Sequence, residues 1–198
     1  MHPLLCCAAL LLPLAAPANA QEVRLSAGLG ATWSSTLVTD QIVNPIDVNP
    51  GLSPTLVLGA SIPAGERIRL GLQGSLSTGS LTAEDEGTGD TDLGSLRTAE
   101  ILLAASGPAM VRQVYWQAGL GLLKYLPSEK QGLFLQGGPT RLLGSVGAEY
   151  RYPWKPGMDL TVSARYTYHR FTTAELERRG FSRTQDVHRI ALTVGIAR

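Results

Sequence analysis

Eight segments of the chain alternate apolar residues with polar or very small residues at a period of two. In the first of them, Val23, Leu25 and Leu29 share one parity, whereas Arg24 and Ser26 share the other. Successive side chains of a β-strand point to opposite faces, so this period is typical of strands. After residue 20, apolar residues at helical spacing never persist for more than a turn or two. The pattern predicts an all-β chain with strands at 23–34, 55–62, 67–77, 98–105, 113–122, 141–152, 160–169 and 189–196.

The composition of the two strand faces indicates their surroundings. Each apolar face holds four to six residues, which fits the roughly 9 to 11 residues that a tilted strand needs to cross a bilayer. The other face is dominated by Gly, Ser and Thr with single Arg or Glu residues, and this composition suits a crowded polar interior. The apolar faces are therefore expected to face lipid. A soluble barrel with its apolar side chains inside is the alternative.

The connections between the strands alternate in length. Short turns marked by Pro and Gly are expected at 63–66, 106–109 and 153–157. Longer polar segments are expected at 35–52, 79–94, 127–139 and 172–185. This alternation and the even strand count predict an eight-stranded antiparallel up-and-down transmembrane β-barrel with both termini at the short-turn end. Aromatic side chains are expected in two girdles, one at each rim: Tyr150, Tyr152 and Trp154, and Trp33, Tyr166 and Tyr168.

The first 20 residues have the features of an export signal. Leu4–Leu12 is an almost unbroken apolar run, and Ala18-Asn19-Ala20 supplies a small-x-small cleavage pattern. We therefore expect a signal peptide at 1–20 and one barrel domain at 21–198. Both cysteines, Cys6 and Cys7, lie in the signal peptide, so the mature chain is expected to lack disulfides and Cys-based metal sites. The net charge of +1 argues against nucleic-acid binding, and no cofactor is expected.

The pattern covers the whole mature chain, from Glu22-Val23-Arg24-Leu25-Ser26-Ala27-Gly28-Leu29-Gly30 to His188-Arg189-Ile190-Ala191-Leu192-Thr193-Val194-Gly195-Ile196. It resembles that of the small eight-stranded outer-membrane β-barrels, the OmpA/OmpX-like group. The resemblance implies a monomer in the outer membrane of a Gram-negative-type cell, assembled by the barrel-assembly machinery and in contact with outer-membrane lipid and lipopolysaccharide. Members of the group usually end in an aromatic residue, whereas this chain ends in Ala197-Arg198.

Seven charged residues have the polar parity and are expected to point into the barrel: Arg67, Arg69, Glu100, Glu149, Arg151, Arg165 and Arg189. Eight strands enclose an interior just wide enough for side chains to fill it. Isolated buried charges are costly unless they are paired. We therefore expect a network of ion pairs that plugs the lumen. The alternative is a gated polar path, which would make the barrel a narrow conduit for ions or small solutes.

The external loops are the remaining candidates for function, because binding residues often lie on loops held by a rigid scaffold. Arg178, Arg179 and Arg183 are candidates for contact with lipopolysaccharide phosphates. Leu133-Phe134-Leu135 is an apolar segment inside the third long loop. Three roles are open for it: a lid over the barrel mouth, contact with a partner, or simple packing.

Barrels of this size include lipid A deacylases, which carry a Ser two positions after a His. Here Phe171 follows His169 at that spacing, and Ile190 follows His188. No catalytic, cofactor-binding or metal-binding residue is therefore predicted. The sequence predicts a structural or surface-interaction barrel without enzymatic activity. The narrow conduit and a soluble, lipocalin-like ligand-binding barrel are the alternatives.

Overall fold

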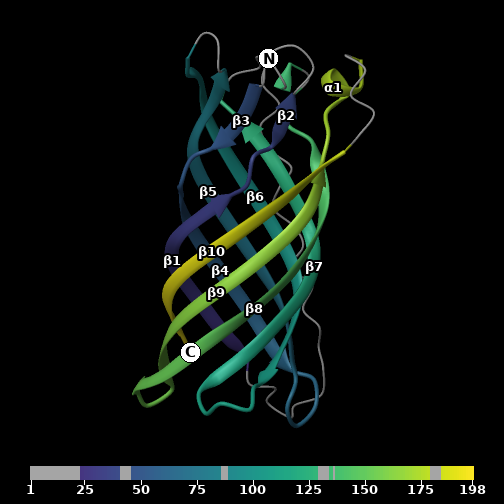
Figure 1. The fold of residues 1–198 in the computed structure, drawn as a ribbon. Helices are drawn as coiled ribbons and strands as arrows, with labels where there is room; N and C mark the ends of the chain where they lie inside the picture. Colours follow the sequence, from purple (N-terminus) through teal and green to yellow (C-terminus); the bar gives the residue numbers. More distant parts are fainter. Residues whose placement is uncertain (1–22, 41–45, 86–88, 129–133, 136, 179–183) are drawn as a thin grey trace, which may run out of the picture.

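The computed structural model describes residues 23–40, 46–85, 89–128, 134–135, 137–178 and 184–198. Within these residues the chain forms ten strands and one short helix (Figure 1). In chain order they are β1 (Arg24–Ser34), β2 (Val38–Asp40), β3 (Ile46–Pro50), β4 (Ser53–Pro63), β5 (Arg69–Asp85), β6 (Thr91–Pro108), β7 (Val114–Pro127), β8 (Thr140–Lys155), β9 (Met158–Phe171), α1 (Ala174–Arg178) and β10 (Gln185–Ala197). Among the described residues, no helix is long and apolar enough to cross a membrane.

Eight of these strands close into one antiparallel barrel (Figure 1). Their order around the wall is β5-β4-β1-β10-β9-β8-β7-β6, and the pairing of β5 with β6 closes the ring. The first strand, β1, pairs with the last strand, β10, from Ser26↔Ala197 to Ser34↔Arg189. Closure gives the backbone N–H and C=O groups of the wall hydrogen-bond partners, which they need inside the hydrocarbon of a membrane. The prediction of an eight-stranded up-and-down barrel is confirmed.

The two ends of the barrel differ. Short connections at 64–68, 109–113 and 156–157 lie at the same end as the carboxyl terminus, and we call it the turn end (Figure 1). The opposite end is the loop end. There β5 and β6 extend farther than expected, because β5 continues to Asp85 and β6 begins at Thr91. Most of the segment predicted as a loop at 79–94 is therefore strand.

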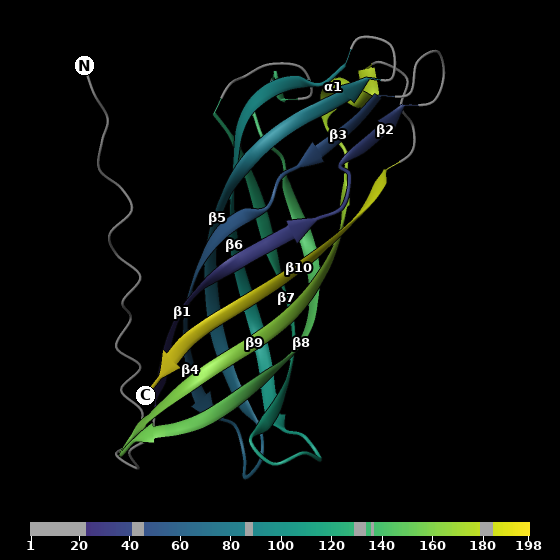
Figure 2. The same cartoon turned by 60° about the vertical axis from the view of Figure 1, so that its left-hand side comes forward.

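The segment predicted as a loop at 35–52 is also partly strand. The short strands β2 and β3 pair with each other, and β3 pairs with the outer part of β5, at the loop end (Figure 2). A backbone hydrogen bond from Leu37 N to Val48 O, 2.8 Å, continues this pairing, and Gly51 N donates to Ser80 O at 2.9 Å. The strands β1 and β2 therefore form one interrupted arm of a hairpin, and β3 and β4 form the other.

Large apolar side chains point outward from every strand of the barrel. Each barrel strand carries at least one such residue that is more than half exposed; in chain order they are Leu29, Leu58, Leu72, Leu103, Leu120, Leu142, Val162 and Leu192. The opposite parity points inward and carries mainly small and polar residues. This exterior suits hydrocarbon and is the reverse of what a soluble barrel needs. The soluble, lipocalin-like alternative is therefore not supported.

Aromatic side chains mark both rims of this apolar exterior. Tyr152 and Trp154 are exposed at the turn end, and Trp33 and Tyr166 are exposed towards the loop end. Tyr168, beside Tyr166, is partly exposed, and its hydroxyl donates a 2.6 Å hydrogen bond to Asp186. Two aromatic girdles are characteristic of membrane barrels.

Candidate functional site in the barrel lumen

The middle of the lumen holds three buried charged side chains: Glu100 of β6, Arg165 of β9 and Arg189 of β10. We call them the central charge network. Glu100 Oε2 accepts a hydrogen bond from Arg165 Nη2 at 3.0 Å, and Glu100 Oε1 accepts one from Arg189 Nη1. One carboxylate therefore binds both guanidinium groups, and the network keeps a net charge of +1.

Polar side chains on the facing strands satisfy other donors of the two arginines. Arg165 Nη1 donates to Gln73 Oε1 of β5 at 2.7 Å. Arg189 Nη2 donates to Ser77 Oγ of β5 at 3.1 Å and to Thr98 Oγ1 of β6 at 3.0 Å. In the ring of eight strands, β9 lies opposite β5 and β10 lies opposite β6. The central charge network therefore joins opposite walls of the lumen.

Burial makes the central charge network sensitive to the loss of any member. The low dielectric constant of a protein interior strengthens a satisfied ion pair and makes an unsatisfied charge costly. Removing one partner of a buried pair typically costs about 3–5 kcal/mol. The loss of Glu100 would leave the most charges without a partner, because its two carboxylate oxygens bind two guanidinium groups.

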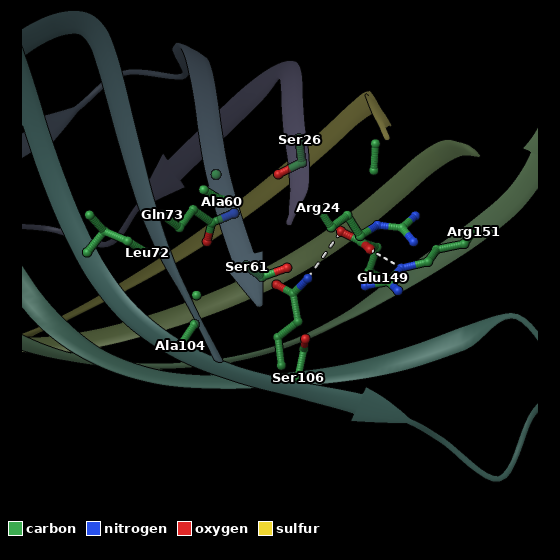
Figure 3. A pocket seen from close by; sticks show the side chains of 14 residues that line it. Arg24, Ser26, Ala60, Ser61, Leu72, Gln73, Ala104, Ser106, Glu149 and Arg151 are labelled. Atoms are coloured by element: carbon green, nitrogen blue, oxygen red, sulfur yellow. Dashed lines mark hydrogen bonds and ion pairs between the residues drawn. The ribbon is translucent and has the colours of Figure 1, made fainter. Parts of the chain in front are cut away.

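A polar cavity of about 70 Å³, shown in Figure 3, is lined by residues near the turn end, among them Arg24, Ser106 and Arg151, and we call it the turn-end cavity. At its edge, Glu149 Oε1 accepts a hydrogen bond from Arg151 Nε at 2.5 Å, and Glu149 Oε2 accepts one from Gln117 Nε2 at 3.1 Å. Arg24, which also lines the cavity, forms an ion pair with Asp159. A water needs about 10–15 Å³ of such space, so this turn-end cavity has room for several waters.

The loop-end part of the lumen is apolar, unlike its middle. A cluster of buried side chains fills it, which we call the loop-end plug: Leu37, Val38, Val48, Leu81, Leu96, Leu102, Leu123, Tyr125, Phe134, Leu143, Phe171, Leu176 and Val187. The rings of Tyr125 and Phe171 meet edge to face at 5.1 Å between centroids, and those of Phe134 and Phe171 at 6.0 Å. Leu176 adds a side chain from α1. The plug thus occupies the loop end of the lumen with apolar groups, which disfavour contact with water.

A tyrosine and a histidine lie where the polar and apolar parts of the lumen meet. Tyr125 of β7 and His169 of β9 are both almost fully buried, and the Tyr125 hydroxyl lies 2.6 Å from His169 Nε2. His169 Nδ1 is buried without a hydrogen-bond partner among the described residues. The pair therefore depends on a single hydrogen bond in a place that excludes water.

Solved structures with a similar fold share little sequence with this chain. The crystal structure of Neisserial surface protein A matches with a TM-score of 0.59 and 13% identity, covering 88% of this chain and 95% of that chain. The outer membrane protein OprG from Pseudomonas aeruginosa matches with a TM-score of 0.56 and 12% identity, over 88% and 93% of the two chains. This chain has the fold of the small eight-stranded outer-membrane β-barrels.

A third barrel of this fold, the outer membrane protein AlkL, was solved by solid-state NMR in lipid bilayers. It matches with a TM-score of 0.54 and 14% identity, covering 89% of each chain. No protein-family model and no curated protein sequence matches the chain. The likeness therefore concerns the outer-membrane barrel fold, and any role must be argued from the residues of this barrel.

The structure puts six of the seven predicted lumen charges inside the barrel. Three form the central charge network, and Glu149 and Arg151 form the pair at the turn-end cavity. Arg69 is half-buried, and its Nη2 donates to Ser61 O at 3.0 Å. Arg67 differs from the expectation and is exposed. The turn between β4 and β5 is longer than predicted, with Ala64 N donating to Ile68 O at 2.8 Å, so Arg67 belongs to the turn and not to the strand.

The predicted basic cluster is only partly described. Arg178 lies in α1 and forms a 2.5 Å ion pair with Glu175, one helical turn earlier. Arg179 and Arg183 lie outside the described residues. Among the residues that the structure does describe, no group of three or more His, Cys, Asp or Glu side chains is placed to hold a metal ion.

Sequence reasoning missed the loop-end plug. Leu102, Leu123 and Leu143 point inward although the inward parity was expected to be polar. Leu102 was the visible signal, because it interrupts the alternation of the fourth predicted strand. Phe134 is buried against Tyr125 and Phe171, whereas Leu135 is exposed and Leu133 lies outside the described residues, so a lid over the mouth and simple packing both stay open for this apolar segment.

Proposed function

We propose that this protein spans the outer membrane of a Gram-negative-type cell as a closed, non-conducting barrel with a structural or surface-interaction role and no enzymatic activity. Export through a cleaved signal at residues 1–20 and insertion by the barrel-assembly machinery belong to this proposal. The turn end then faces the periplasm, because short turns are periplasmic in such barrels. The apolar exterior and the two aromatic girdles support the membrane location.

Two successive barriers in the lumen, the central charge network and the loop-end plug, support the proposal that the barrel is closed. The central charge network joins opposite walls through Glu100, Arg165 and Arg189. Beyond it, the loop-end plug is apolar, with Leu123, Phe171 and Val187 fully buried. An ion moving through the lumen would have to separate buried ion pairs and then enter an apolar layer, and both steps are unfavourable.

The attachment of the β2–β3 hairpin and α1 to the barrel supports a surface role. The hairpin of β2 and β3 is paired to β5, and Leu176 of α1 is buried in the loop-end plug. These described loop-end elements are thus anchored on a rigid scaffold, which is the usual arrangement for binding loops. Outer-membrane lipid and lipopolysaccharide are the partners proposed for this monomeric barrel.

Planar-bilayer recordings of the purified protein test this function. We expect no unitary conductance steps, because the central charge network and the loop-end plug both remain in place. Insertion and folding are checked on the same preparation by the difference in gel migration between unboiled and boiled samples. Discrete steps from a heat-modifiable preparation would contradict the closed barrel.

A narrow conduit for ions or small solutes is the second candidate. The turn-end cavity favours it, because polar space lined by Arg24 and Arg151 reaches into the lumen from one side. Transport through it would require both barriers to open during function. Conductance that responds to reversing the charge of Arg165 or Glu100 would support the conduit in place of the closed barrel.

A further inference from the structure

The outer wall of the barrel is hollowed near its loop end. The hollow measures about 850 Å³, within the range of about 300–1,000 Å³ common for small-molecule sites. Four exposed leucines from four strands line it: Leu29, Leu56, Leu76 and Leu126. The next outward positions on β4 and β5 carry the short side chains of Pro54 and Thr78, so the wall is recessed there. An apolar chain fits this recess better than water does.

One cation lines this recess, and a second is its neighbour in the sheet. Arg97 of β6 lines the hollow, is exposed and lies in register with Thr78 on one side and Leu126 on the other. Lys124 of β7, also exposed, pairs with Ala99 and is therefore a diagonal neighbour of Arg97 on the same outward face. Such diagonal neighbours are within reach of each other's long side chains. The two residues are a pair of positive charges at the loop-end limit of the apolar outward run Leu103, Ile101 and Ala99 of β6.

The partners of these cations distinguish them from another outward cation at the same end. Arg97 makes no hydrogen bond or ion pair with any residue that the structure describes, and Lys124 Nζ donates to Gly138 O at 2.8 Å. By contrast, Arg170 of β9 has Asp186 within 3.8 Å. Arg97 and Lys124 therefore keep donors for an anion from outside the chain.

We propose that the hollow, Arg97 and Lys124 form a site for one phosphorylated acyl lipid of the outer leaflet, the lipid A part of lipopolysaccharide. An acyl chain occupies the recess between the leucines, and a phosphate accepts charge-assisted hydrogen bonds from Arg97 and Lys124. The site rests on the proposed membrane orientation, which puts the loop end in the outer leaflet. It lies on the barrel wall, apart from the cluster of Arg178, Arg179 and Arg183 that the sequence suggested.

Native mass spectrometry of the delipidated full-length barrel in detergent tests the site, with bis-phosphorylated lipid A as the probe. We expect one lipid A to bind, and the double variant R97Q/K124Q to bind at least about tenfold more weakly, since two charge-assisted contacts are lost. Thr78→Trp fills the recess and should weaken binding while both cations remain. Arg170→Gln is the matched control, because it removes an exposed outward cation at the same end that already has an acidic neighbour.

Chemically altered probes separate this site from general lipid adhesion. Lipid A without its phosphates should bind about as weakly to the wild type as lipid A does to R97Q/K124Q. Equal binding of the dephosphorylated probe, equal binding of phosphatidylglycerol, or an equal effect of Arg170→Gln would each overturn the site. A heat-modifiable, non-conducting barrel that fails these tests would disprove the lipid site alone, whereas a protein that stays in the soluble periplasmic fraction would disprove the membrane barrel as well.

Discussion

Glu100 of β6 and Arg165 of β9 form an ion pair of 3.0 Å, although β7 and β8 separate their strands in the wall. No backbone hydrogen bond joins these two strands, so the side chains supply a connection that the sheet does not. Arg189 of β10 binds the other oxygen of the same carboxylate. A single acidic side chain thus links three strands across the lumen, and this makes Glu100 the most informative residue to change.

Glu100→Gln should destabilise the folded barrel by about 3–5 kcal/mol, because it leaves two buried guanidinium groups without a negative partner at nearly constant side-chain volume. The measurement is urea unfolding in lipid vesicles, followed by tryptophan fluorescence. Glu84→Gln is the control, since Glu84 is an exposed acid at the loop end of β5. If both variants unfolded at the wild-type urea concentration, the central charge network would not stabilise the barrel.

Tyr125→Phe tests the polar contact inside the loop-end region. The change leaves His169 Nε2 without its partner in a place that excludes water, so we expect a loss of about 1–3 kcal/mol in the same unfolding experiment. Tyr166→Phe is a closely matched control, because the Tyr166 hydroxyl also lies 2.6 Å from a histidine nitrogen, His188 Nδ1, but on the exposed outer face. There, water or lipid headgroups replace the lost partner, and the effect should stay within about 0.5 kcal/mol. Equal losses in the two variants would argue against burial as the cause.

The strands, and which of their side chains point inward or outward, could be predicted from the sequence because both depend on local alternation. The period of two decides which side chains share a face, and it identified Glu100, Arg165 and Arg189 as inward charges. Their mutual contacts could not be predicted, since they depend on which strands lie opposite each other and on how far each strand is displaced along its neighbour. The prediction failed at Arg67 for a local reason, because the hydrogen bond from Ala64 to Ile68 extends the turn by residues that alternation assigns to the strand.

The apolar end of the lumen lay beyond prediction for a different reason. Leu123 and Leu143 have the inward parity, but Leu123 lies at the end of one stretch of regular alternation and Leu143 at the start of the next, on either side of the predicted loop at 127–139. They are buried in one cluster with Phe134 and Leu176, which come from two different loop-end connections. Packing between separate loops leaves no periodic trace in the sequence. The proximity of Arg97 and Lys124 could not be predicted either, because only the register between β6 and β7 makes them neighbours.

Gly121→Ala should impair folding through close backbone contact. A Cβ at Gly121 of β7 would lie 2.0 Å from the carbonyl oxygen of Ile101 on the paired strand β6. Backbone atoms cannot withdraw without breaking the pairing, so we expect a loss of at least about 1–3 kcal/mol and a smaller heat-modifiable fraction. Gly74→Ala is the control, because its Cβ would meet nothing closer than 3.8 Å. Equal folding of the two variants would contradict the close packing of β6 against β7.

The inward charges also predict the ion selectivity of a barrel that has been opened deliberately. Six cations and three acids point into the lumen from the described strands: Arg24, Arg69, Arg141, Arg151, Arg165 and Arg189, and Glu100, Glu149 and Asp159. Replacing the central charge network by serines and truncating the plug with Phe134→Ala leaves four of these cations and two of these acids. A narrow path lined by excess positive charge favours anions. We therefore expect the opened variant to conduct chloride in preference to potassium, measured as the reversal potential in a potassium chloride gradient.

A charge reversal within the opened variant makes this prediction decisive. Changing Arg24→Glu and Arg151→Glu at the turn-end cavity leaves two inward cations and four inward acids, so the reversal potential should change sign. The gel migration of unboiled samples verifies that both variants still form barrels. Cation selectivity in the first variant, or the same sign in both, would mean that ions do not pass the turn-end cavity, and the current would then have to arise from a path other than the lumen.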